Sequence, residues 1–227
     1  KGLGHGDFHL IVYAPASVQE MVDMVVTAFN KADEYRVPAM ILADGLLGQM
    51  MEPVAFPEIS AEQPDKSSWA ANGHKNSREH HIVNSLYIDP KTLEDKIIER
   101  YERYAKIKEN EADAELYLTD DADIVVCAFG ATSRVVKSAI NDARAMGIKV
   151  GMCRPKTVWP FPEKQIREAC ANASKVLCVE MSMGQMIDDV KLALNCEKPV
   201  EFFGRTGGVI PTPAEVLDKI KSMGGNK

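Results

Sequence analysis

Apolar residues are spaced in two ways at the start of this sequence, and each spacing predicts a type of element. Residues 10–14 (LIVYA) form a short apolar run that is typical of a buried strand. Ser17 and Glu20 then form a capping box. After it, apolar residues recur at helical spacing: Val18, Met21, Val22, Val25, Val26 and Phe29. With the second apolar run at residues 37–43 (VPAMILA), the pattern predicts strand, helix and strand joined as a right-handed parallel crossover.

Both apolar runs are nearly continuous, which predicts strands that are buried on two faces. Such burial needs further strands and helices that residues 1–57 do not contain. We therefore expect residues 1–57 to be the incomplete C-terminal part of an α/β domain, and the chain to be the C-terminal part of a longer protein.

A change of composition marks residues 58–118 as a connector. Polar residues and prolines prevail from Pro53 to about residue 90, with a short extended piece over residues 82–88. Residues 91–115 then keep their apolar side chains on one helical face, which predicts an amphipathic helix. Its charged run is interpreted as a solvated face, with a docking surface as the alternative.

Strand and helix patterns alternate regularly from residue 119 to residue 227. The alternation predicts a complete α/β domain with an open, mostly parallel sheet covered by helices on both faces. Gly147 falls where a helix should stop, and Thr212 with Glu215 forms a capping box before the last helix. The expected segments are DADIVVCAFG, TSRVVKSAINDARAMG, IKVGMCR, PEKQIREACANAS, KVLCVEMS, MGQMIDDVKLALN, PVEFFG and PTPAEVLDKIKSMGG.

Ligands of such sheets bind beyond the carboxyl ends of the strands, so the residues there are candidate site residues. Gly130 opens a turn whose N–H groups could hold an anion or simply cap a helix. Arg154, Glu180 and Gln185 follow the next two strands and suit either an anionic ligand or a domain interface, of which we favour the interface. Asp44 ends the last strand of the first segment.

The glycine-rich start of the chain holds the remaining candidates. His5 and Gly6 stand beside the carboxylate of Asp7 in GLGHGD, where backbone could approach a ligand closely, although a structural turn explains the same residues. The glycines precede a strand, so they are not a dinucleotide-binding loop, and no nucleophile–base pair or metal-ligand spacing is evident. No catalytic or metal-ligating residue is therefore assigned.

Composition narrows the classes of function. The chain has 227 residues, 45% of them hydrophobic, and a net charge of -6, which disfavours nucleic acid as a partner. No apolar run is long enough for a membrane span. The five cysteines form no Cys-x-x-Cys pair, so neither a disulfide framework nor an iron–sulfur or zinc site is expected. These features favour a cytoplasmic protein.

Six segments, in this order, resemble the α chain of the 2-oxoacid:ferredoxin oxidoreductases, and most closely the branched-chain, 2-oxoisovalerate type. They are GLGHGDFHLIVYAPASVQEMVDMVVTAF, VPAMILADGLLGQMMEPV, VNSLYIDP, CRPKTVWPFP, VLCVEMSMGQM and GRTGGVIPTPAEVL. The resemblance covers essentially the whole chain. It implies that residues 1–57 end a pyrimidine-binding-like domain of a thiamine enzyme, and that residues 119–227 form a transketolase-C-terminal-like domain.

The resemblance also implies an activity, cofactors and partners. Such an enzyme uses thiamine diphosphate and magnesium to decarboxylate a 2-oxoacid oxidatively, gives acyl-CoA with coenzyme A, and passes electrons to ferredoxin. A separate β chain would hold the diphosphate, and ferredoxin-like and γ chains would complete the complex and carry the iron–sulfur clusters. His5, Gly6, Asp7 and Asp44 would lie nearest the substrate and cofactor. The chain alone is expected to bind no cofactor and to be inactive.

Some alternatives stay open at this point. Another thiamine enzyme, a transketolase or the β chain of a 2-oxoacid dehydrogenase, shares the second architecture, and the chain could act as an assembly module. The sequence leaves undecided which 2-oxoacid is used and where coenzyme A binds. Apolar strands without neighbours could also drive homo-oligomer formation.

Overall fold

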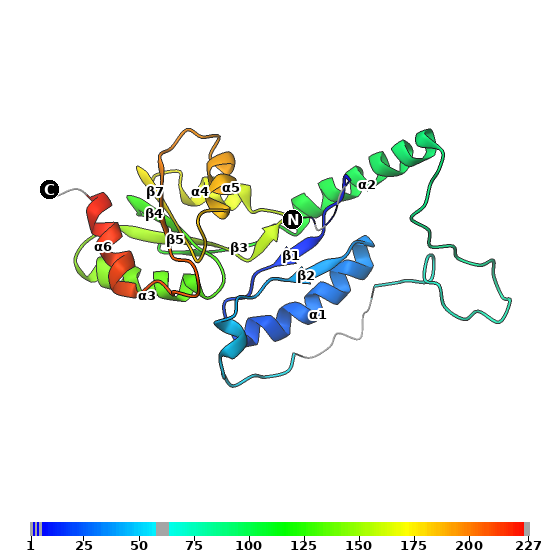
Figure 1. Ribbon diagram of the computed structural model, residues 1–227, viewed down its shortest axis with the longest axis horizontal. Helices are drawn as coiled ribbons and strands as arrows, with labels where there is room; N and C mark the ends of the chain where they lie inside the picture. Colours follow the sequence, from blue (N-terminus) through cyan, green and yellow to red (C-terminus); the bar gives the residue numbers. More distant parts are fainter. Residues whose placement is uncertain (1, 3, 5, 58–63, 225–227) are drawn as a thin grey trace.

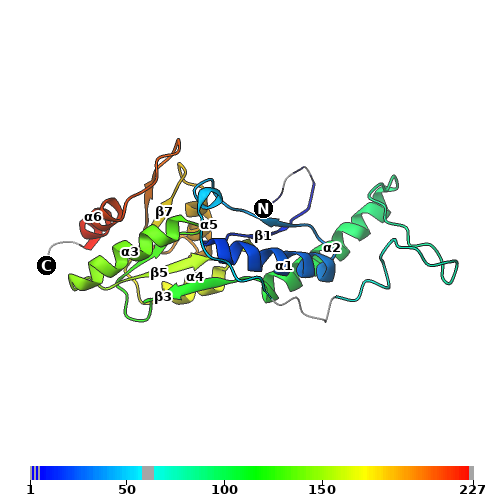
Figure 2. The same cartoon turned by 90° about the horizontal axis from the view of Figure 1, so that it is seen from below.

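Two β-sheets lie end to end in the computed structural model, which describes residues 2, 4, 6–57 and 64–224 (Figures 1 and 2). The first sheet has three strands in the order β2-β1-β6, and the second has five in the order β3-β5-β4-β7-β8. Helices cover both sheets, so the chain is of the α/β class, as the sequence predicts.

The first sheet contains the expected crossover. Strand β1 (Ile11–Tyr13) pairs in parallel with β2 (Ala39–Ile41), and helix α1 (Val18–Tyr35) connects them. The hydroxyl of Ser17 accepts the N–H of Glu20 at 3.1 Å, so the predicted helix start is confirmed. A short 3-10 helix, η1 (Leu47–Gln49), follows β2.

The second sheet is mostly parallel, as predicted. Three parallel pairings join β5, β4, β7 and β8, and only β3 runs antiparallel, along β5. Its elements are β3 (Ala114–Tyr117), β4 (Ile124–Cys127), α3 (Thr132–Ala145), β5 (Val150–Pro155), α4 (Glu163–Ala169), β7 (Lys175–Glu180), α5 (Met186–Ala193), β8 (Val200–Gly204) and α6 (Pro213–Gly224).

Helices bury the two faces of this sheet in separate cores. Val126 and Leu177 pack on one face with residues of α3 and α6, while Val125 and Cys127 pack on the other with residues of α4 and α5. The opposite faces follow from the two-residue period of a strand. The capping box before α6 is confirmed, because Thr212 and Glu215 each accept the other's backbone N–H.

The helix expected over residues 91–115 ends earlier than the pattern indicates. Helix α2 runs over Pro90–Asn110, and Ala114–Tyr117 forms strand β3. Glu115 and its neighbours favour helix by composition, but pairing with β5 supplies backbone hydrogen bonds and buries Ala114 and Tyr117 partly in the two cores. The stretch from Ala114 therefore belongs to the second sheet rather than to the connector.

A further strand, β6 (Thr157–Trp159), was not predicted. It follows β5 after a single residue and pairs antiparallel with β1, so the chain passes directly from the second sheet into the first. The backbone N–H of Ala14 also donates to the carbonyl of Lys156 at 2.8 Å. The two sheets are thus joined by continuous backbone.

Residues 64–89 run out from the body and return to the start of α2 (Figure 1). The extended piece expected over residues 82–88 pairs with no strand in the described part of the chain, and Ile82 and Ile88 are 86% and 87% exposed. None of the helices that the structure describes is both long and apolar enough to span a membrane.

Candidate functional site

A cleft of about 310 Å³ lies where the carboxyl ends of strands from both sheets meet. Asp44 borders it beyond β2, Gly130 beyond β4, and Glu180 with Gln185 beyond β7. Four candidate residues from distant parts of the sequence therefore share one cleft. The rule that sites form at the carboxyl ends of parallel strands is the physical reason for their proximity.

Asp44 closes one wall of the cleft by reaching from the first sheet to the start of α3. Its Oδ2 accepts the N–H of Ala131 at 3.2 Å, and its Oδ1 accepts the N–H of Leu47 at 2.8 Å. Gly130 has a φ of 59°, and a Cβ built there would lie 3.3 Å from Asp44 Oδ2. The turn at Gly130 therefore does hold an anion, but that anion is the carboxylate of Asp44.

Glu180 forms the opposite wall and is only 3% exposed. Its carboxylate accepts the backbone N–H groups of Gln185, Met186 and Ile187, each at 3.0 Å, and the hydroxyl of Ser182 at 3.0 Å. Burial alone would raise the pKa of Glu180, but these donors outweigh burial and hold the pKa below its ordinary value. Glu180 is thus an ionised cap of helix α5.

These bonds decide what the cleft can do chemically. Both carboxylates are occupied by backbone N–H groups, so neither is arranged as a general acid or base. The side chain of Gln185 is exposed at the cleft and can contact a ligand or another chain. The geometry suits binding or positioning rather than proton transfer.

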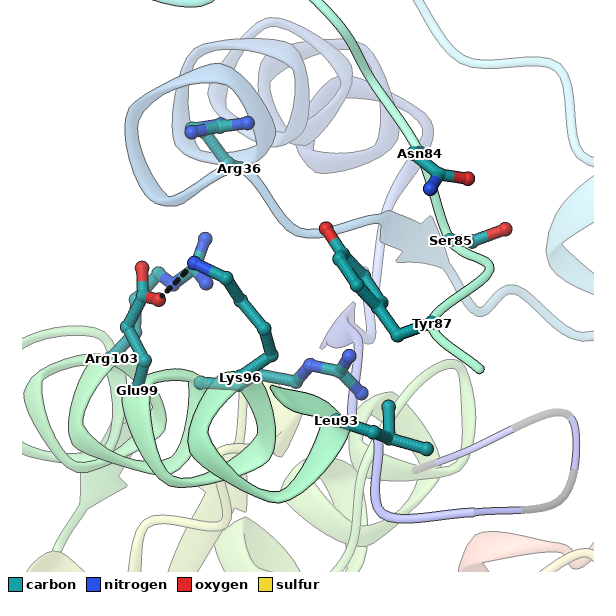
Figure 3. A pocket seen from close by; sticks show the side chains of 9 residues that line it. Arg36, Asn84, Ser85, Tyr87, Leu93, Lys96, Glu99 and Arg103 are labelled. Carbon is teal, nitrogen blue, oxygen red and sulfur yellow. Dashed lines mark hydrogen bonds and ion pairs between the residues drawn. The ribbon is translucent and has the colours of Figure 1, made fainter. Parts of the chain in front are cut away.

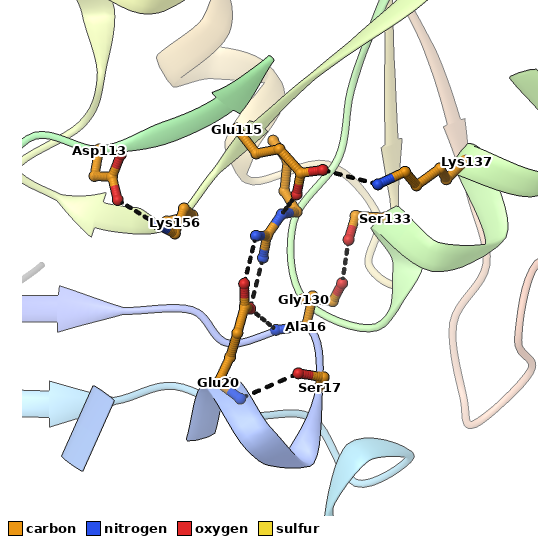
Figure 4. A network of polar contacts seen from close by, with 10 residues as sticks. Ala16, Ser17, Glu20, Asp113, Glu115, Gly130, Ser133, Lys137 and Lys156 are labelled. Atoms are coloured by element: carbon orange, nitrogen blue, oxygen red, sulfur yellow. Dashed lines mark hydrogen bonds and ion pairs between the residues drawn. The ribbon is translucent and has the colours of Figure 1, made fainter. Parts of the chain in front are cut away.

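Arg154 lies outside this cleft, in an ion network between the two sheets. Figure 4 labels its partners Glu20 and Glu115. Its Nη1 and Nη2 donate to the two carboxylate oxygens of Glu20 at 2.9 and 2.7 Å. Its Nε donates to Glu115 at 2.7 Å, and Glu115 also pairs with Lys137 at 2.9 Å. The side chain is 4% exposed, so the geometry places Arg154 in the contact between the sheets.

The network shifts the ionisation of its members. Burial would raise the pKa of Glu20 and of Glu115, but hydrogen bonds and the nearby positive charges lower both pKa values. Burial would lower the pKa of Arg154, and its two carboxylate partners raise it instead. All three groups are therefore held in their charged forms.

The glycine-rich start of the chain lies at the other end of the first sheet. His5 is outside the described residues, while Gly6 and Asp7 are exposed and precede the amino end of β1. The carbonyl of Asp7 accepts from Arg100 at 3.3 Å. Because β1 and β2 are parallel, Asp44 beyond the carboxyl end of β2 is not brought to Gly6 and Asp7.

Sequence reasoning missed Glu20 and Glu115 as partners of Arg154. Glu20 carried a signal only as part of a capping box, and its Oε2 also accepts the N–H of Ala16 at 2.8 Å. Glu115 gives no such signal in the sequence, because the pattern over residues 91–115 predicts that it ends a solvated helix. Among the described residues, no group of three or more His, Cys, Asp and Glu side chains is arranged to hold a metal ion.

Comparison with known families covers both sheets. The profile of the family described as "Pyruvate flavodoxin/ferredoxin oxidoreductase, thiamine diP-bdg" matches residues 3–117, and "Pyruvate:ferredoxin oxidoreductase core domain II" matches residues 122–216. The chain belongs to the 2-oxoacid:ferredoxin oxidoreductase family. The resemblance seen in the six sequence segments is therefore confirmed.

Two relatives show which members of the family this chain is similar to in sequence. The ketoisovalerate oxidoreductase subunit VorB of Methanothermobacter thermautotrophicus is 44% identical over 226 residues, which are 100% of this chain and 64% of the relative. The 2-oxoglutarate synthase subunit KorA of Methanothermobacter marburgensis is 34% identical, over 96% of this chain and 65% of that relative. The chain thus spans somewhat under two thirds of the length of these proteins.

A solved structure agrees with the fold. The 2-oxoglutarate:ferredoxin oxidoreductase from Magnetococcus marinus, solved with 2-oxoglutarate, coenzyme A and succinyl-CoA bound, matches with a TM-score of 0.73 at 21% identity. The match covers 97% of this chain and 43% of that chain. Both sheets of this chain therefore follow an arrangement that the family uses.

Thiamine diphosphate is the cofactor named in the family profile that matches residues 3–117. The turn most suited to a diphosphate, at Gly130, already binds the carboxylate of Asp44 through the N–H of Ala131. The turn at Gly130, as it is occupied in this structure, therefore does not fit the diphosphate end of the cofactor.

Proposed function

We propose that this chain is part of a 2-oxoacid:ferredoxin oxidoreductase whose substrate is 2-oxoisovalerate. The enzyme would convert the 2-oxoacid and coenzyme A to acyl-CoA and carbon dioxide, while two electrons pass to ferredoxin. The observation that carries the proposal is the 44% identity to a ketoisovalerate subunit along the full chain, against 34% to a 2-oxoglutarate subunit.

The same proposal places the cofactors mainly on partner chains. A β chain would hold the diphosphate and magnesium, ferredoxin-like chains would carry the iron–sulfur clusters, and a γ chain would complete the complex. Support comes from the relatives' names, which describe them as subunits, and from the poor fit of the Gly130 turn to a diphosphate. The chain alone would then be inactive.

We further propose a division of labour within the chain. Residues 1–57 would contribute a pyrimidine-binding-like unit, residues 58–113 a connector, and residues 114–227, from strand β3 onward, a transketolase-C-terminal-like unit. Gly6 and Asp7, with His5, remain candidates to lie near substrate and cofactor. Asp44 and Arg154 would act as positioning residues, because both bond across the contact between the sheets.

A cytoplasmic location is part of the proposal. All five cysteines are free, and four of them are buried. Free thiols are typical of a reducing compartment.

Reconstitution with the partner chains tests the proposed activity. Reduction of a low-potential acceptor should require both coenzyme A and a 2-oxoacid, and kcat/KM should be highest for 2-oxoisovalerate when it is compared with 2-oxoglutarate and pyruvate. A higher kcat/KM for 2-oxoglutarate would overturn the substrate assignment. Activity with a sugar acceptor or lipoamide in place of coenzyme A would favour the alternative of another thiamine enzyme.

A further inference from the structure

Four basic side chains surround a hollow of about 250 Å³ that the proposed activity does not use (Figure 3). Arg36 approaches from the residue that follows α1, and Lys96, Arg100 and Arg103 come from α2. Residues 84–87 form the third side and add the polar groups of Asn84, Ser85 and Tyr87. The hollow is thus built from three separate segments of the chain.

The guanidinium groups around the hollow are not neutralised. Within the part of the chain that the structure describes, Arg36, Arg100 and Arg103 form no ion pair with a carboxylate. Lys96 is the one of the four that pairs with a carboxylate among the described residues, with Glu99 at 2.9 Å. Four positive charges therefore face one negative charge, in a chain whose overall net charge is -6.

Neutral groups make close contacts with these arginines, and the Glu99 carboxylate acts on Arg36 and Arg103 through charge without an ion pair. Arg100 and Arg103 each donate one hydrogen bond to a backbone carbonyl, at 3.3 Å in both cases. The guanidinium of Arg36 lies 5.1 Å from the centre of the Trp69 ring. Each guanidinium has five N–H donors, so most of them remain available for an anion.

The backbone of Arg36 gives a second indication of function. Its φ of 52° is in the left-handed region, where glycine is the favoured residue at the end of a helix. A residue with a long side chain is strained there, and strained positions of this kind are enriched at binding sites. Arg36 lines the hollow from the end of α1 (Figure 3), with its guanidinium turned toward the ring of Trp69.

We propose that this hollow binds a phosphate group, either as inorganic phosphate or as the phosphate of an organic ester. Planar guanidinium forks match the oxygens of phosphate in pairs, and an excess of three positive charges suits a doubly charged anion better than a single carboxylate. The arginines also line a neighbouring hollow of about 140 Å³ with Phe8, Val37, Pro38 and Tyr104, which leaves room for the organic part of an ester. The proposal does not depend on the 2-oxoacid substrate.

Calorimetric titration of the assembled enzyme with inorganic phosphate and with phenyl phosphate tests the site. Saturable binding of one anion per chain is expected, weakening as salt is added. Arg36→Gln and Arg100→Gln should each weaken binding about fivefold or more, as expected for loss of a charge-assisted hydrogen bond. Glu99→Gln should tighten binding, because it removes the negative charge beside Lys96. Lys106→Gln is the matched control, because Lys106 is on the same helix but outside the hollow. This variant should leave the affinity for the anion unchanged.

The two probes distinguish the sources of the phosphate. Tighter binding of phenyl phosphate identifies an ester as the ligand class, and equal binding identifies inorganic phosphate. Absence of saturable binding, or binding that Arg36→Gln and Arg100→Gln leave unchanged, overturns the proposal. Binding to the free chain that disappears on assembly also overturns it, since an acidic surface of a partner chain would then fill the hollow. Arg36 is exposed, so its variant should keep the unfolding midpoint of the parent.

Discussion

Arg154 and Glu20, which are 134 residues apart in the sequence, form a two-point ion pair between the second sheet and helix α1 (Figure 4). The pair is almost fully removed from water on the arginine side, where the side chain is 4% exposed. Two parallel N–H···O bonds fix direction as well as distance. The pair therefore adds a directional contact between the two sheets, beside the backbone that joins them through β6.

Removal of Arg154 should destabilise the chain strongly. Arg154→Met leaves Glu20 and Glu115 without their shared cation, and breaking a buried pair in this way costs about 3 kcal/mol in the free energy of unfolding. Urea unfolding at pH 7 measures the effect. Lys156→Gln is the matched control, because its pair with Asp113 is exposed and should contribute under about 1 kcal/mol. Equal losses in the two variants would contradict the role given to Arg154.

Gly130→Ala tests the link between Asp44 and the start of α3. A residue with a Cβ is disfavoured at a φ of 59°, and the new methyl group would press on Asp44 Oδ2, so a loss of about 1–2 kcal/mol is expected. Amide exchange at Ala131 should also become faster as its bond to Asp44 weakens. Gly45→Ala is the control, since nothing lies within 4 Å of its Cβ position. Similar stability of the two variants would argue against a constrained turn at Gly130.

Local signals in the sequence were sufficient for most of the fold, and long-range pairing explains the rest. Ser17 and Thr212 cap helices through bonds to residues three positions away, so their roles can be read from spacing alone. Strand β6 could not be found in this way, because its three residues become a strand only through pairing with β1, about 145 residues earlier in the chain.

The same distinction applies to the candidate residues. The carboxyl-end rule placed Asp44, Gly130 and Glu180 at strand ends, and these three residues do line one cleft. The rule could not show that backbone N–H groups occupy both carboxylates, because Asp44 bonds a residue 87 positions away. The carboxyl-end rule also identified no partner for Arg154. A charged residue that faces solvent and one that contacts another part of the chain have the same appearance in a sequence.

Acid should destabilise the chain through three carboxylates whose pKa values are lowered by folding, Glu20, Glu115 and Glu180. Such groups contribute stability that is fully present above the unfolded pKa of about 4.3 and is lost as the pH falls through the folded pKa. Each contributes a slope of at most about 1.4 kcal/mol per pH unit in that window. Urea unfolding between pH 3 and pH 7 should therefore show a steep fall below about pH 4.5.

Glu180→Gln isolates one contribution to this acid sensitivity. In the parent, three backbone N–H groups of α5 and the residue before it donate to the two carboxylate oxygens of Glu180. The amide of the variant cannot ionise and has one acceptor oxygen, so the variant should be less stable at pH 7. Its stability should also fall less steeply than that of the parent below about pH 4.5. Parallel curves for parent and variant would show that Glu180 does not titrate with folding.

Thiol labelling should distinguish one cysteine from the other four. Cys153 and Cys178 lie opposite Cys127 on the strands at either side of it, and Cys170 packs in the same core, so these four thiols are buried together. Burial raises the pKa of Cys153 to about 12, and a hydrogen bond to Cys170 together with burial raises that of Cys127 well above its ordinary value.

Ellman's reagent should therefore label one thiol per native chain, Cys196, and five after unfolding in guanidinium. A Cys196→Ser variant should give none in the native state and four when unfolded. Cys170 is the informative case, because its hydrogen bond with Cys127 lowers its pKa while it remains inaccessible. Rapid native labelling of Cys170 would mean that the core between α4 and the sheet opens without global unfolding, since only the thiolate that reaches solvent can react.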